Sequence, residues 1–138
     1  MDKQQLKHRT KSFSLAVIKL IGSLPDTKAT RVIGNQMLRS ATSVGANYRS
    51  ACRAKSDKDF LNKIIIVEEE ADETCYWLEL PGESGIVDPK IITPLLMESS
   101  ELTAIFTAAG KTVRNRMNNE TGHKKPVINN PAFRDLTS

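Results

Sequence analysis

The run Glu68–Glu73 holds five carboxylates in six residues, the densest group of chemically capable side chains in the chain. A carboxylate-rich helix is typical of di-iron helical proteins, which take acids from several helices and add histidine from Glu-x-x-His motifs. Here the two histidines are His8 and His123, both near chain ends, and no acid lies between residues 27 and 55. We therefore expect no metal site and no cofactor.

The carboxylates are better interpreted as partners of cations on the preceding helix. Arg39, Ser43 and Asn47 recur every four residues, so they share one side of a helix. Glu69 or Glu70, together with Glu73, would form a matching row that meets them through charge-assisted hydrogen bonds. Arg49 and Arg53 are further candidate cations. The predicted polar core or subunit interface consists of Arg39, Ser43, Asn47, Glu70 and Glu73.

Nucleophilic catalysis lacks the necessary neighbours. Ser43 and Cys52 have no histidine in their region to act as a base, and Cys75 follows an acidic run that disfavours a thiolate. Both cysteines lie in apolar helical stretches, so we expect reduced core residues. No glycine-rich phosphate loop is present. We expect a protein with no catalytic residues that is not an enzyme.

Basic residues gather near both ends of the helical region. In an up-down bundle the start of the first helix and the end of the fourth lie at the same end, so these charges would merge into one patch. Apart from Phe133, these segments lack aromatic residues that could stack on bases. This absence favours contacts to RNA or DNA phosphates. The alternative is an ordinary solvated surface. The candidate nucleic-acid-binding residues are Lys7, Arg9, Lys11, Lys111, Arg114 and Arg116.

The net charge of +4 conceals a strong asymmetry. Residues 56–85 contain nine acidic and two basic residues, net −7, so the rest of the chain carries +11. This distribution predicts internal charge pairing together with a surplus positive surface for an anionic partner.

Apolar spacing predicts four helices. The first would begin at Thr10 as N-cap and stop at Pro25, and the second would span about residues 27–55, capped by Asp26 or Thr27. Small residues in the second helix would let a neighbour approach closely.

The third and fourth helices carry clear start signals. Ser56 and Asp59 form a capping-box pattern, and Pro81, Gly82 and Gly85 end the helix beyond its apolar stripe. Asp88 followed by Pro89 starts the fourth helix, which we expect to reach about Arg116.

Short connections make successive helices antiparallel neighbours, so the predicted fold is all-α, an antiparallel up-down-up-down four-helix bundle. The bundle would span residues 1–117, and residues 118–138 would form a flexible, mostly disordered polar tail. No apolar stretch approaches the roughly 20 residues that span a bilayer, and no signal peptide is recognisable. We therefore expect a cytoplasmic protein without membrane contact.

Three segments resemble one family of small bacterial proteins: Gln36–Tyr48, Asp59–Phe60 and Glu68–Leu80. The family comprises four-helix bundles related to proteins encoded by intervening sequences of large-subunit ribosomal RNA genes. It is similar to the accessory variability protein of diversity-generating retroelements, which forms barrel-shaped homopentamers and binds nucleic acid and a reverse transcriptase. The resemblance implies a homopentamer here, with the Arg39 and Glu70 rows in the polar core or interface.

Two functions remain open from the sequence. The first is a non-enzymatic homo-oligomer whose basic surface binds nucleic acid or a nucleoprotein partner. The second is a structural protein–protein interaction scaffold, in which apolar residues beyond the core stripes make subunit contacts. Those residues, which would otherwise widen the core stripe, are Ile65, Ile66, Trp77 and Leu96.

Overall fold

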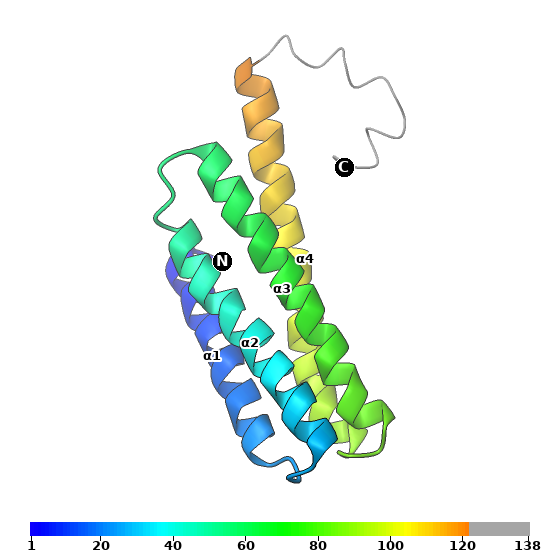
Figure 1. The fold of residues 1–138 in the computed structure, drawn as a ribbon. Helices are drawn as coiled ribbons and strands as arrows, with labels where there is room; N and C mark the ends of the chain where they lie inside the picture. The colour runs from blue at the N-terminus through cyan, green and yellow to red at the C-terminus, as the bar shows by residue number, and fades with distance from the viewer. Residues whose placement is uncertain (122–138) are drawn as a thin grey trace.

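The computed structural model describes residues 1–121, and this part of the chain contains four helices and no strand. Successive helices are antiparallel and joined by short loops (Figure 1), which confirms the predicted all-α bundle. Residues 118–121 belong to the last helix, beyond its predicted end near Arg116, and the remaining predicted tail lies outside the described residues. The helices are α1 (Lys3–Gly22), α2 (Lys28–Ala51), α3 (Asp57–Glu83) and α4 (Pro89–Thr121).

The prediction that Thr10 caps the first helix was wrong. The cap is Asp2, whose carboxylate accepts from the Gln5 N–H at 2.8 Å while the Gln5 side chain accepts from the Asp2 N–H at 2.9 Å. This capping box satisfies donors that the first turn leaves open. Leu6 then extends the apolar stripe one turn earlier, and Thr10 is buried inside the helix.

The other helix starts follow the predicted signals. The Thr27 hydroxyl accepts from the Thr30 N–H at 3.2 Å, and the Ser56 hydroxyl accepts from the Asp59 N–H at 3.1 Å. α3 ends at Glu83, within the predicted terminating segment from Pro81 to Gly85, and Pro81 itself is buried inside the helix. A proline removes one helical hydrogen bond, and its buried ring offsets part of that loss through packing.

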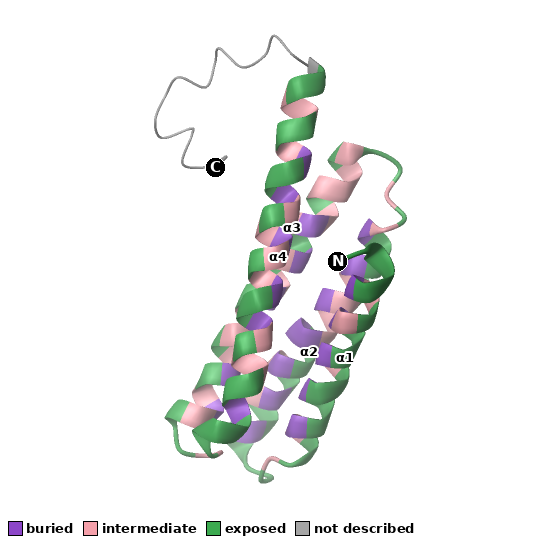
Figure 2. Ribbon diagram, turned by 180° about the vertical axis from the view of Figure 1, so that it is seen from behind, coloured by how far each residue is buried: buried purple, intermediate pink, exposed green. Residues whose placement is uncertain are grey.

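The core lies along the inward faces of all four helices (Figure 2). The predicted stripe of α3 is buried from Ile64 to Leu78. Tyr48 of α2 and Phe106 of α4 pack against each other within the core with ring centroids 5.3 Å apart. The buried Thr74 hydroxyl donates to Ser40 at 2.9 Å, so this polar pair is satisfied across α2 and α3.

The apolar residues considered for subunit contacts divide into two groups. Trp77 and Leu96 are partly buried and pack against the core, so they widen the core stripe. Ile65 is half-buried, whereas Ile66 is 43% exposed. Of these four residues of the described bundle, Ile66 is therefore the one with an exposed side chain.

Three contacts set the register of α1 against α2 and position the groove described below. A Cβ on Gly45 would lie 3.5 Å from the Thr10 hydroxyl, and one on Gly34 would lie 3.6 Å from Ile21. Between them, the Ser14 hydroxyl donates to the Ala41 carbonyl at 3.1 Å. The two helices therefore approach closely along their length, as the small residues of α2 predicted. No helix in residues 1–121 is both long and apolar enough to cross a bilayer.

Candidate nucleic-acid interface

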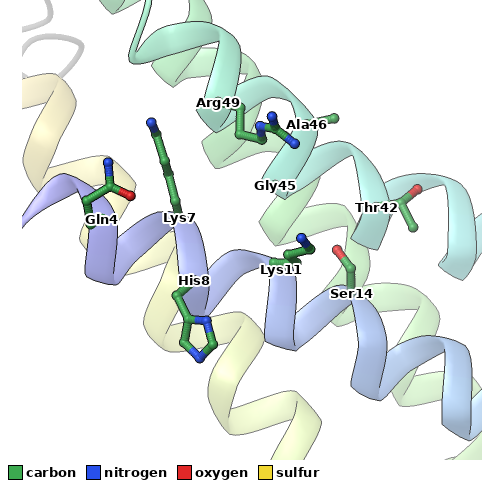
Figure 3. Close-up of a pocket in the computed structure, with 9 residues that line it drawn as sticks. All are labelled: Gln4, Lys7, His8, Lys11, Ser14, Thr42, Gly45, Ala46 and Arg49. Carbon is green, nitrogen blue, oxygen red and sulfur yellow. The ribbon is translucent and has the colours of Figure 1, made fainter.

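A groove lies between the first half of α1 and the second half of α2, with a cavity volume of about 590 Å³. Lys7 and Lys11 project from α1 and Arg49 projects from α2 at the same opening (Figure 3). Lys7 and Lys11 are four residues apart, so they occupy one side of α1. The lining residues are Gln4, Lys7, His8, Lys11, Ser14, Thr42, Gly45, Ala46 and Arg49.

The positive charge of the groove is not neutralised by acidic residues in its lining. Its lining includes no aspartate or glutamate. Within residues 1–121, neither Lys7, Lys11 nor Arg49 forms an ion pair with a carboxylate. Three like charges near one recess attract an anion, and an anion that offers several oxygens can meet all three.

The hydroxyl groups of the groove are already engaged with the backbone. Ser14 donates to the carbonyl oxygens of Thr10 and Ala41, and Thr42 donates to Leu38 at 2.7 Å. The cationic side chains are therefore the groups of the groove best placed to hold an anion. Gly45 and Ala46 add little bulk on the α2 side, which leaves the space between the helices open.

Arg9 does not belong to this groove, although it lies between Lys7 and Lys11 in the sequence. A two-residue offset places it on the opposite side of α1, where it faces α4. Its Nε and Nη2 atoms donate to the two oxygens of Glu98, each at 2.7 Å, and Nη2 lies 3.0 Å from Glu101. The Glu98 hydrogen bond is the main cause that raises the pKa of Arg9. Arg9 thus ties α1 to α4.

The predicted basic residues lie in different surroundings. Arg116 donates to both oxygens of Asp57 at 2.8 and 3.0 Å, and this contact lowers the pKa of Asp57. Lys111 and Arg114 lie on the last turns of α4 and do not line the groove. Helix periodicity sends Lys7 and Lys11 towards α2 and Arg9 towards α4, so these three cations do not share one surface. A role of the six residues in nucleic-acid binding stays a prediction.

The groove instead recruits residues that the sequence did not single out for binding. Arg49 was considered as a partner for the α3 acids, but it lies against α1 with Gln4 and His8. The available signal was Gly45, one turn before Arg49, because a glycine in a helix often marks the close approach of a neighbour.

The predicted polar row between α2 and α3 is formed only at Arg39. Arg39 Nη1 donates to Glu70 at 2.9 Å, and Nη2 pairs with Glu73. The Trp77 indole N–H also donates to Glu73 at 2.8 Å. The indole and then Arg39 lower the pKa of Glu73, while the Glu73 contact raises that of Arg39.

Ser43 and Asn47 do not meet the α3 carboxylates. The Asn47 amide donates to the Ser43 carbonyl at 2.9 Å and to its hydroxyl at 2.7 Å, so both side chains are satisfied within α2. Short side chains with a partner one turn away lose little by staying local, whereas Arg39 is long enough to reach the next helix. A role of this row in a subunit interface stays a prediction.

The bundle consists of two hairpins with opposite charge. Residues 1–56, which include α1 and α2, hold eleven basic and two acidic residues, net +9. Residues 57–121, which include α3 and α4, hold six basic and thirteen acidic residues, net −7. The ion pairs of Arg9 and Arg39 both cross between the hairpins, so they hold the two halves together. The groove cations Lys7, Lys11 and Arg49 form no ion pair within residues 1–121.

The described residues contain no group of three or more side chains able to hold a metal ion. Cys52 and Cys75 are free and half-buried. Burial is the main cause that raises the pKa of the Tyr48 phenol, followed by its hydrogen bond with Cys52. These groups lie apart from the groove lining.

Fold and site together define a small four-helix bundle with a cationic inter-helical groove. The comparisons place it more narrowly: residues 2–108 match the family of 23S rRNA-intervening sequence proteins, and the chain belongs to that family. The crystal structure of a protein of unknown function from the S23 ribosomal protein family of Bacteroides thetaiotaomicron is similar, with 33% identity and a TM-score of 0.71. The match covers 76% of this chain and 97% of that one. No curated protein matches the chain.

Proposed function

We propose that this protein is a non-enzymatic, self-associating helical bundle that binds the phosphate backbone of nucleic acid at the groove between α1 and α2. The observation that carries the proposal is the convergence of Lys7, Lys11 and Arg49, from two helices, on a recess whose lining has no carboxylate. The +9 charge of the first hairpin adds a long-range attraction for a polyanion. No Phe, Tyr or Trp lines the groove, so we expect contacts to phosphate to dominate over stacking on bases.

Binding is tested by fluorescence anisotropy with a labelled RNA strand and a DNA duplex at 50 and 200 mM salt. Three phosphate contacts on a single strand predict a slope of log K against log salt of about −2, or an affinity loss of roughly 20-fold over that range. The Lys7→Glu/Lys11→Glu variant should lose binding, whereas Lys90→Glu, on α4 and outside the groove lining, should retain it. Equal binding by both variants, or none by the native protein at 50 mM salt, refutes the proposal.

Self-association is tested separately by light scattering. The family resemblance implies a pentamer, so a species of about five protomers is expected. A monomer would remove the oligomer from the proposal without touching the groove.

A second candidate is a protein-interaction scaffold. It is favoured by exposed aliphatic residues outside the groove, namely Val32 at 55%, Ile91 at 57% and Met97 at 66% exposure. Recovery of a stoichiometric protein partner after nuclease treatment, together with no salt-dependent binding of RNA or DNA, would favour the scaffold.

A further inference from the structure

The cationic groove continues into an exposed aliphatic surface. On α1, Leu15 follows Lys11 by four residues and Ile18 follows by seven, so all three lie on one side of the helix. Leu15 is 58% exposed and Ile18 is 47% exposed. These two side chains lie one and two turns beyond Lys11, outside the groove lining, and their exposure leaves them available to a ligand that extends past the groove.

The same two kinds of side chain recur on α2 in the reverse order along the chain, with the aliphatic residue first and the cation last. Leu38 is 37% exposed, and Thr42 and Arg49 follow it at four and eleven residues on one helical side. Because α1 and α2 are antiparallel, the aliphatic part of each helix meets that of the other. The register supports this placement, since Ser14 contacts Ala41 and Ile21 lies opposite Gly34. Ile18 and Leu38 lie between these two contacts.

The surface between α1 and α2 therefore has two parts: a cationic part at Lys7, Lys11 and Arg49, and an aliphatic part at Leu15, Ile18 and Leu38. A ligand that matches both carries phosphate at one end and an exposed apolar face next to it. A single-stranded nucleic acid offers both, because its unstacked bases expose their faces beside the backbone. In a duplex those faces are stacked inside, and only the backbone and base edges are available.

The size of the recess leads to the same ligand. Its volume of about 590 Å³ lies within the roughly 300–1,000 Å³ typical of pockets for compact ligands. Such a space suits a short stretch of one strand. A duplex is wider than the spacing of two packed α-helices, so it would contact only the rim of the groove.

We propose that the groove binds single-stranded nucleic acid, with phosphates at Lys7, Lys11 and Arg49 and an unstacked base against Leu15, Ile18 and Leu38. The inference rests on the proposed function, since it specifies which form of nucleic acid the groove takes. Aliphatic contact with a base face is sequence-tolerant, so the preference concerns strandedness and not base identity.

The test measures the affinity of the full chain for three ligands at 50 mM salt. The ligands are a labelled single strand, the duplex of the same sequence, and an abasic strand of equal length, which keeps the phosphates without the bases. The native protein should bind the single strand about five- to tenfold more tightly than either of the other two. Leu15→Ser/Ile18→Ser should lose that advantage and bind the single strand and the abasic strand equally.

The control variant is Val32→Ser/Met97→Ser, which removes two exposed aliphatic side chains outside the groove lining. It should retain the preference for the single strand. Because all four positions are more than 45% exposed, the variants should keep the helical circular-dichroism spectrum of the native protein. A change in that spectrum would be checked with the single variants Leu15→Ser and Ile18→Ser.

Two negative outcomes are distinguishable. If the duplex binds as tightly as the single strand and Leu15→Ser/Ile18→Ser changes nothing, the inference is overturned while backbone binding stands. If none of the three ligands binds, the proposed function fails as well, and an acidic segment of a protein partner becomes the occupant to seek.

Discussion

Arg9 offers the sharpest distinction between a structural cation and a binding cation. Its guanidinium donates to both oxygens of Glu98 and approaches Glu101, so replacing it with glutamine should remove this polar contact between α1 and α4. Lys11 lies two residues away, carries the same charge and lines the groove. Arg9→Gln should therefore lower the stability of the fold and leave nucleic-acid binding unchanged. Lys11→Gln should weaken nucleic-acid binding and leave the stability unchanged.

The magnitude follows from the geometry and exposure of the pair. Hydrogen bonds to charged groups contribute about 1.5–3 kcal/mol, and exposed ion pairs contribute about 0.2–1 kcal/mol. The Arg9 and Glu98 side chains are 22% and 28% exposed, which places this two-point contact between those ranges. We expect Arg9→Gln to reduce the free energy of unfolding by about 1.5 kcal/mol, which lowers Tm by roughly 6 °C in a chain of this size.

The assay combines urea denaturation with anisotropy on the same samples. A double-mutant cycle with Glu98→Gln should give a coupling energy of about 1 kcal/mol, because each single variant breaks the same contact. Lys11→Gln should leave the urea midpoint unchanged and reduce the salt slope of binding by about 0.7 to 1. The reasoning is refuted if Arg9→Gln leaves the midpoint unchanged and weakens RNA binding as much as Lys11→Gln does.

Further predictions concern the core, the backbone and the polar network. Phe106→Ala, at a position with no exposed surface, should lower the free energy of unfolding by about 3–5 kcal/mol in urea melts. Gly34→Ala should raise Tm, because the new Cβ would make an ordinary 3.6 Å contact and the substitution would improve helix propensity by up to about 1 kcal/mol. Gly85→Ala should lower Tm, because Gly85 has a φ of +80°, which an L-alanine rarely adopts. Trp77→Phe removes a hydrogen bond that lowers the pKa of Glu73, so its stability deficit should be largest at neutral pH.

The sign of the pH effect follows from that lowered pKa. A carboxyl with a depressed folded pKa stabilises the fold above its unfolded pKa, about 4.3 for glutamate, and loses this contribution as pH falls through the folded value. The Trp77→Phe deficit should therefore shrink below about pH 4, leaving only the lost packing, and a deficit constant from pH 7 to pH 3 would contradict the assignment. A native-like urea midpoint for Phe106→Ala, or equal Tm changes for the two glycine variants, would contradict the other two predictions.

Local signals predicted much of the fold. Thr27 and Ser56 cap their helices as expected, because a side-chain hydroxyl that accepts from the third residue is a local interaction. The stripe from Ile64 to Leu78 is buried because its spacing alone places it on one face of α3. The helix ends were less predictable. Asp2 caps α1 in place of Thr10, and α3 includes Pro81 and continues to Glu83.

The candidate site shows where local reasoning stops. Helical periodicity alone puts Lys7 and Lys11 on one side of a helix and Arg9 on the other. The residue composition shows in addition that the first 56 residues are strongly basic and the following 65 are acidic. Those properties belong to the sequence by itself, because they depend only on residue order and on the 3.6-residue repeat.

Only the tertiary structure decided which helix each side meets. Close packing of α1 on α2 at Gly45 brought Arg49 to Lys7 and Lys11, and packing against α4 gave Arg9 its carboxylates. The physical reason is that the role of a cation on a helix depends on the residue opposite it. A cation that faces a carboxylate forms a structural ion pair, whereas a cation that faces none is available to bind an anion. That neighbour comes from a segment distant in the sequence, so its identity depends on how the four helices pack.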